Sequence, residues 1–224
     1  MNAIVTGGNR GIGLELVRQL LARGFKVHAA CRDPDSAKEL RATAARVYGV
    51  DVSSAASVAA FARSLDGVAI DLVINNAGVY GDARQRIQDF DYAAATRTFE
   101  TNALGALRIS QAFLPHLRRG TGKKLAHISS TMGSIAATSS PGDLAYRVSK
   151  AALNMISKSI ALELSDDHII SIVVHPGWVR TDMGGPNAPM TAAESARGIL
   201  AQIDAAGVVD SGAFLDFKGE RCAW

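Results

Sequence analysis

Several residue types that would mark other classes of protein are scarce in this sequence. Its 224 residues include only two cysteines, Cys31 and Cys222, too few for a disulfide framework or a cysteine metal site. No apolar run approaches the roughly 18 residues of a membrane span, and no charged segment followed by a long apolar one opens the chain. We therefore expect no metal, no membrane contact and a reducing, cytoplasmic location.

A concentrated block of one charge is also missing. The formal net charge is +3, and the densest basic stretch, 118–119 with 123–124, is short. A nucleic-acid surface needs basic residues gathered on one face or along one helix, so we expect no nucleic-acid partner. A solvated helix end or loop accounts for this stretch.

The chain has no proline- and serine-rich linker and no internal repeat, which predicts a single domain over residues 1–224. Short β-rich apolar runs alternate with longer helical ones, a pattern typical of α/β proteins. The fold predicted is a doubly wound, parallel sheet of about seven strands with helices on both faces. The expected strands are 3–6, 26–30, 46–50, 70–74, 124–129, 169–175 and 213–216, and the expected helices are 12–23, 35–44, 55–65, 91–117, 143–165 and 191–205.

Ligands of such sheets bind outside the carboxyl ends of the strands. Six of the expected strands are followed by polar residues or glycine where a ligand would lie. These residues are at 6–7, 31–32, 51, 75–78, 129–130 and 175–177. Their agreement is stronger support for a ligand site than any one motif.

The stretch 6–13 follows the first expected strand and opens the first expected helix. Glycines let a backbone turn tightly and approach a pyrophosphate, which the helix N-terminus then attracts through its free N–H groups. A glycine cluster alone can be a plain turn, but the strand before it and the amphipathic helix after it favour a Rossmann-type dinucleotide site. Its expected cofactor-binding residues are Gly7, Asn9, Arg10, Gly11, Ile12 and Gly13.

The end of the second strand indicates which dinucleotide binds. NAD-binding versions place an acidic residue there, whereas this chain has Cys31 followed by Arg32. Together with Arg10, Arg32 offers two guanidinium groups to the 2′-phosphate of NADP(H), which is therefore the preferred cofactor. In the alternative interpretation Arg32 lies in a solvated turn and Asp33 takes the acidic role, so that NAD(H) binds.

Tyr146 and Lys150 are four residues apart in an expected helix and therefore share one face. A phenol has a pKa near 10, and a nearby ammonium group stabilises the phenolate, which lowers that pKa. Most pairs with this spacing are ordinary surface neighbours, so the pair carries weight only together with other motifs.

Those motifs are present. The stretch 6–13, the stretch 75–78, Asn102, Ser130, the pair Tyr146 and Lys150, and the stretch 176–181 together resemble the short-chain dehydrogenase/reductase pattern, in its usual order and over essentially the whole chain. The stretches 129–134, 146–155 and 175–186 resemble, more narrowly, the branch of C-factor-like proteins and sniffer-type carbonyl reductases.

The resemblance implies a role for each matching residue. Tyr146 would act as the general acid or base, and Lys150 would bind the nicotinamide ribose and lower the pKa of Tyr146. Ser130 would polarise the substrate oxygen, and Asn102 would disturb its helix and hold a water that links Lys150 to solvent. The implied cofactor contacts are Asp51 and Val52 at the adenine, Asn75, Ala77 and Gly78 beside the adenine-side ribose, and Pro176, Gly177, Val179 and Thr181 at the nicotinamide. A structural role at the strand end is the alternative for Asn75 and its neighbour.

One departure from the family pattern is the long spacing between Ser130 and Tyr146, with extra residues at 136–143. Their small, turn-forming types predict a loop directed outward, which would leave both catalytic groups in place. If that loop did not point outward, Ser134 would compete with Ser130 for the polarising role.

The function predicted is hydride transfer between NADP(H) and a small carbonyl or alcohol substrate, with a small lid at 182–191. The alternatives are a C-factor-like signalling protein with incidental reductase activity, and a cofactor sensor without catalysis, which the intact Ser130, Tyr146 and Lys150 disfavour. The helices expected at 91–117 and 143–165 could pair in a homodimer. In the other interpretation Ala112, Phe113, Leu117 and Met155 face the chain's own core.

Overall fold

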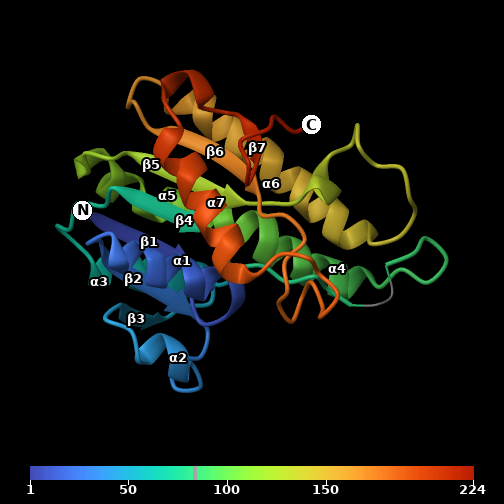
Figure 1. The fold of residues 1–224 in the computed structure, drawn as a ribbon, viewed down its shortest axis with the longest axis horizontal. Coiled ribbons are helices and arrows are strands. Elements are labelled where there is room, and N and C mark those ends of the chain that lie inside the picture. Colours follow the sequence, from blue (N-terminus) through green and yellow to red (C-terminus); the bar gives the residue numbers. More distant parts are fainter. Residues whose placement is uncertain (83–84) are drawn as a thin grey trace.

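The computed structural model describes residues 1–82 and 85–224. One parallel sheet contains seven strands in the order β3-β2-β1-β4-β5-β6-β7, so the order reverses between β1 and β4 (Figure 1). The strands are β1 (Asn2–Thr6), β2 (Lys26–Cys31), β3 (Arg46–Gly49), β4 (Leu72–Asn75), β5 (Lys124–Ile128), β6 (Ile170–His175) and β7 (Phe214–Asp216). The predicted fold class is confirmed.

Helices cover both faces of the sheet (Figure 1). Helix α1 (Gly11–Ala22), the short α2 (Lys38–Arg41) and α7 (Ala192–Ala205) contribute to the apolar cluster on one face. On the other face the cluster includes α3 (Ala55–Ser64), α5 (Gly105–Arg119) and α6 (Leu144–Glu163). Helix α4 (Tyr92–Phe99) packs against α6, and short helical turns lie at Thr131–Gly133 and Val208–Asp210.

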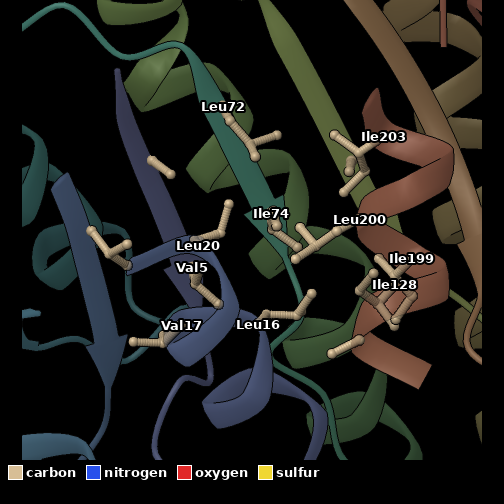
Figure 2. Close-up of a cluster of buried hydrophobic side chains, with 14 of the residues drawn as sticks. Val5, Leu16, Val17, Leu20, Leu72, Ile74, Ile128, Ile199, Leu200 and Ile203 are labelled. Atoms are coloured by element: carbon tan, nitrogen blue, oxygen red, sulfur yellow. The ribbon is translucent and has the colours of Figure 1, made fainter. Parts of the chain in front are cut away.

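The first of these cores follows from helical periodicity. Leu16, Val17 and Leu20 of α1 recur on one face and point toward the sheet, where Val5 and Ile74 meet them (Figure 2). Ile199, Leu200 and Ile203 of α7 complete the same layer. This packing fixes the start of α1, and therefore the glycine loop, against the ends of β1 and β4.

The helix expected over 35–44 is shorter than predicted, because its first residues belong to a turn. The Asp33 carboxylate accepts hydrogen bonds from the backbone N–H groups of Asp35 and Ser36, at 3.1 and 3.3 Å. A side chain that bonds its own backbone in this way competes with helix formation. Only Lys38–Arg41 is helical.

The single helix expected over 91–117 is also wrong, because a π-helical turn, Glu100–Leu104, separates α4 from α5. A π-turn widens the helix and often marks a functional site. Asn102 lies in it, so the expectation that this residue disturbs its helix is confirmed. Beyond the turn, α5 continues through Pro115 to Arg119.

The extra residues before α6 form the outward loop that the sequence predicts (Figure 1). Residues 135–141 are exposed, and three groups of the Arg147 side chain contact this loop at Gly142, Thr138 and Ser140. Ser134 is buried and donates to the backbone oxygen of Trp224. Ser134 is therefore bonded away from Ser130 and does not compete with it.

Within 1–82 and 85–224, no helix has both the length and the apolar run that crossing a membrane requires.

Candidate active site

The glycine loop after β1 is folded so closely that glycine is required. Gly7 and Gly11 have φ angles of 67° and 54°, which side chains rarely adopt. A Cβ on Gly13 would lie 2.1 Å from the backbone oxygen of Gly7. The amide of Asn76 donates to the backbone oxygens of Thr6 and Gly7, so it fixes the loop to the end of β4.

The start of α1 has the features of an anion site. Within 1–82 and 85–224, no side chain caps this helix, and its first turn contains no acidic residue. The first N–H groups of a helix have no partner inside the helix and carry its positive dipole end. Gly11, Ile12 and Gly13 present these groups beside Asn9 and Arg10.

The end of β2 carries the residues on which the two interpretations of cofactor choice depend. Cys31 packs in the apolar core, and burial raises the pKa of its thiol. Arg32 is exposed and lies close enough to Asp51 for its charge to lower the pKa of that carboxyl, behind the larger effect of the Ser53 hydrogen bonds. The Asp33 carboxylate is exposed and uses one of its oxygens to accept backbone hydrogen bonds from its own turn.

Arg10 has a partner that the sequence did not indicate. Its Nη1 lies 2.6 Å from an Asp182 carboxylate oxygen, in an ion pair whose side chains are 68% and 74% exposed. An exposed pair of this kind contributes at most about 1 kcal/mol. This ion pair connects the glycine loop to the segment after β6. A second contact between the same two segments places Gly11 against the Thr181 side chain.

Two expected cofactor contacts have side chains turned into the protein. The Asn75 amide is buried and donates to Ser110, with His127 at 3.3 Å. Val52 is buried against Gly105. For Asn75 the structural alternative describes the side chain. Ala77 lies against Gly7, and its backbone N–H donates to the Thr6 hydroxyl.

Tyr146, Lys150 and Ser130 lie together where β5 ends and α6 begins. All three are more than nine-tenths buried. The Lys150 ammonium donates to the backbone oxygen of Ile128 at 2.9 Å and lies 5.7 Å from the centre of the Tyr146 ring. The Ser130 side chain bonds to the Tyr146 phenol, which lowers its pKa in part.

Burial has the largest effect on the pKa values of Tyr146 and Lys150. It raises the pKa of Tyr146 to about 12, and the Ser130 bond offsets only part of that effect. It lowers the pKa of Lys150 to about 8. The predicted lowering of the Tyr146 pKa is therefore reversed, because the cost of burying a phenolate exceeds the stabilisation by its neighbours. At neutral pH Tyr146 holds its proton.

Asn102 connects the segment after β4 to the helix of Tyr146. Its side-chain oxygen accepts the Val79 N–H at 2.8 Å, and its amide donates to the Val79 oxygen and the Ser149 hydroxyl. Ser149 in turn donates to the Tyr146 backbone oxygen. A Cβ on Gly78 would lie 3.3 Å from the Asn102 oxygen and 3.6 Å from the Lys150 nitrogen, so glycine gives this segment its close approach.

The residues expected at the nicotinamide form the turn after β6. Pro176 accepts a hydrogen bond from Ser195, and Gly177 adopts a φ of 84° beneath Met190. Val179 is buried and pairs with Met190 through an isolated β-bridge. The segment expected as a lid is thus attached at its base.

Three residues near Tyr146 were not identified from the sequence: Tyr80, Gln85 and Asp143. The Tyr80 ring packs on the Tyr146 ring at 4.7 Å between centres, and its hydroxyl bonds to Asp143. Gln85 is buried and accepts the Tyr146 N–H. An aromatic residue two positions after the 75–78 motif was a signal for Tyr80, but no pattern in the sequence marks Gln85.

Known proteins share this architecture. The family model for short chain dehydrogenases matches residues 1–192. The C-signal protein of Myxococcus xanthus is 46% identical over 165 residues, which is 74% of this chain and 99% of that protein.

Two solved structures share the whole fold. The NADPH-bound carbonyl reductase from chicken fatty liver has a TM-score of 0.93 and 36% identity, covering 100% of this chain and 98% of that one. Carbonyl reductase Sniffer of Drosophila melanogaster has a TM-score of 0.93 and 30% identity, covering 100% and 99%. Together with the seven-stranded parallel sheet, these matches show that the chain belongs to the short-chain dehydrogenase/reductase family, in the branch of the C-signal and sniffer-type carbonyl reductases.

Proposed function

We propose that this chain is an NADPH-dependent carbonyl reductase in which Tyr146 is the general acid. The observation that carries the proposal is the buried group of Tyr146, Ser130 and Lys150 at the carboxyl end of the sheet. The similarity to an NADPH-bound carbonyl reductase supports it.

The glycine loop fits the dinucleotide. Close backbone turns at Gly7 and Gly13 leave room for a pyrophosphate, and the uncapped start of α1 supplies the N–H groups that would hold it. Arg10 and Arg32 would meet the 2′-phosphate, and Asp51 would lie near the adenine. When bound, NADPH supplies the hydride for the carbonyl carbon.

Residues of the chain supply the proton that the substrate oxygen receives. Ser130 donates a hydrogen bond to the substrate oxygen and holds the carbonyl beside Tyr146. Tyr146, protonated at neutral pH, gives its proton to that oxygen as negative charge develops there. Lys150 fixes the ribose hydroxyls with its ammonium group, and Asn102 and Ser149 hold the helix turn that carries both residues.

The experiment that tests this function follows NADPH oxidation by the purified chain over a panel of aldehydes, ketones and quinones. We expect turnover of some panel members that disappears in the Tyr146→Phe variant. Tight NADPH binding without turnover of any carbonyl would contradict the proposal.

The second candidate is a signalling protein that binds the dinucleotide and reduces carbonyls only incidentally. The observation in its favour is the 46% identity to the C-signal protein. It predicts cofactor binding with an intact Tyr146 and only slow turnover over the whole panel, so the same assay separates the two candidates.

Cofactor choice gives a further prediction. Arg32→Ala should raise the Kd for NADPH about 10- to 100-fold, because a hydrogen bond to a charged group contributes roughly 1.5 to 3 kcal/mol. The Kd for NADH should change less than about threefold, since NADH has no 2′-phosphate. Titration by NADPH fluorescence measures both, with the exposed Arg63→Ala as the control. Tighter binding of NADH than of NADPH by the wild type would overturn the preference.

A homodimer is the assembly that the exposed face of α6 supports. Val148, Met155 and Leu162 recur every seven residues and are 50%, 65% and 68% exposed, whereas Phe113 and Leu117 lie in the core. A row of exposed apolar side chains on one helix face is a candidate for contact with a partner. We expect Met155→Glu with Leu162→Glu to shift the mass in light scattering from dimer to monomer, while a wild type that is already monomeric would contradict the dimer.

A further inference from the structure

The helix that carries Tyr146 begins without a cap of its own. The first N–H groups of any helix need partners from outside it. Asp143, the residue before α6, adopts a left-handed φ of 54° and makes no capping bond. Its side chain instead bonds to the Tyr80 hydroxyl.

Gln85 provides partners for two of these N–H groups. Its backbone oxygen accepts the Leu144 N–H at 3.2 Å, and its side-chain oxygen accepts the Tyr146 N–H at 3.0 Å. The side-chain amide donates to the backbone oxygens of Tyr80 and Asp82, at 3.1 and 2.7 Å. Because Gln85 is only 4% exposed, water does not substitute easily for these bonds.

The same segment also holds the ring of Tyr146. The Tyr80 ring packs against it with 4.7 Å between ring centres and 31° between ring planes. Aromatic contacts of this kind stabilise one relative orientation of two rings. Both the backbone and the ring of Tyr146 are thus fixed by residues 80 and 85, which come from the connection after β4.

We propose that Gln85 is a positioning residue for Tyr146. It replaces the missing cap of α6 and, through the Tyr80 backbone, couples the ring contact to the helix start. The inference rests on the proposed function, because it concerns the placement of the general acid. A displacement of about 1 Å in a reacting group can lower a rate about 100-fold, so the loss of this support should appear in kcat.

Gln85→Met keeps the size of the side chain and removes its hydrogen bonds, while Gln85→Glu keeps an acceptor for the Tyr146 N–H. We expect Gln85→Met to lower kcat about 10- to 100-fold and to leave the Kd for NADPH within about twofold. Gln85→Glu should recover at least part of the lost kcat. Steady-state kinetics and NADPH fluorescence give the two readouts.

The matched control is Gln19→Met, because Gln19 donates from its side chain to the Ala193 backbone oxygen on the far face of the sheet. A merely structural role predicts that both methionine variants lose similar thermal stability and keep kcat, and that result would overturn the proposal. An equal loss in kcat and in NADPH affinity would overturn it as well.

If Gln85→Met does not fold, Tyr80→Leu tests the ring contact alone, and an unchanged kcat in that variant contradicts the coupling. Failure of this inference is separable from failure of the function. A Tyr146→Phe variant that still turns over carbonyls rejects the function, whereas loss of turnover there with normal kcat in the Gln85 variants rejects only the positioning role.

Discussion

Tyr146→Phe should lower kcat/KM for carbonyl reduction by about 1,000-fold or more, because positioned proton transfer contributes roughly 100- to 10,000-fold. The variant removes one hydroxyl and keeps the ring, so the contact with Tyr80 persists. The phenol holds its proton because burial raises its pKa to about 12, and phenylalanine has no proton to give. The Kd for NADPH should change less than about threefold, since the glycine loop and Lys150 are intact.

Tyr48→Phe is the matched control. The Tyr48 hydroxyl bonds to His28 at 3.1 Å, in β3 and β2, away from the Tyr146 group. Its loss should affect stability and leave kcat/KM unchanged. Equal activity of the two variants would remove Tyr146 from the mechanism and leave an unidentified group as the acid.

Lys150→Met should stabilise the folded chain at pH 7, although it removes a residue that the proposed function requires. A fall in the pKa of Lys150 from 10.5 to about 8 on folding corresponds to about 3 kcal/mol of unfavourable burial. Loss of the hydrogen bond to the Ile128 oxygen offsets about 1 kcal/mol of that gain. We therefore expect a rise of about 2 kcal/mol in the free energy of unfolding.

The sign of the pH dependence gives a sharper test. Below pH 8 Lys150 is charged in both the folded and the unfolded chain, and the whole penalty applies. Between about 8 and 10.5 the unfolded chain retains a proton that the folded chain has lost, so the wild type gains stability as pH rises. The advantage of Lys150→Met should shrink in this window.

Urea unfolding at pH 7 and pH 10 measures the effect, with the exposed Lys26→Met as control. A variant that is less stable than the wild type at pH 7 would show that packing around the Lys150 chain, and not desolvation of its charge, governs this position.

Periodicity and strand-end residues were sufficient to predict the sheet and most helices, because each strand and each amphipathic helix carries its own apolar pattern. A disturbance of the helix at Asn102 was anticipated only from the family resemblance, and its form as a π-turn was not. The short α2 escaped prediction because Asp33 bonds its own backbone, a local competition that composition does not reveal.

The placement of candidate residues was predictable where one motif holds them close together in sequence, as with the glycine loop and the pair Tyr146 and Lys150. It was not predictable where distant segments exchange single hydrogen bonds. Gln85 reaches Tyr146 across 61 positions, and Arg10 reaches Asp182 across 172. The reversal of the Tyr146 pKa also depends on burial, which no spacing of residues expresses.

The ion pair of Arg10 with Asp182 makes Asp182 a tethered competitor for any anion that approaches the same guanidinium. A tethered group acts at an effective concentration that diluting the protein does not lower. If Arg10 binds the 2′-phosphate, cofactor entry is an exchange of anions, and the segment after β6 loses its tie to the glycine loop. NADH, which lacks the 2′-phosphate, leaves that tie in place. The two cofactors would then leave the substrate entrance in different states before any chemistry occurs.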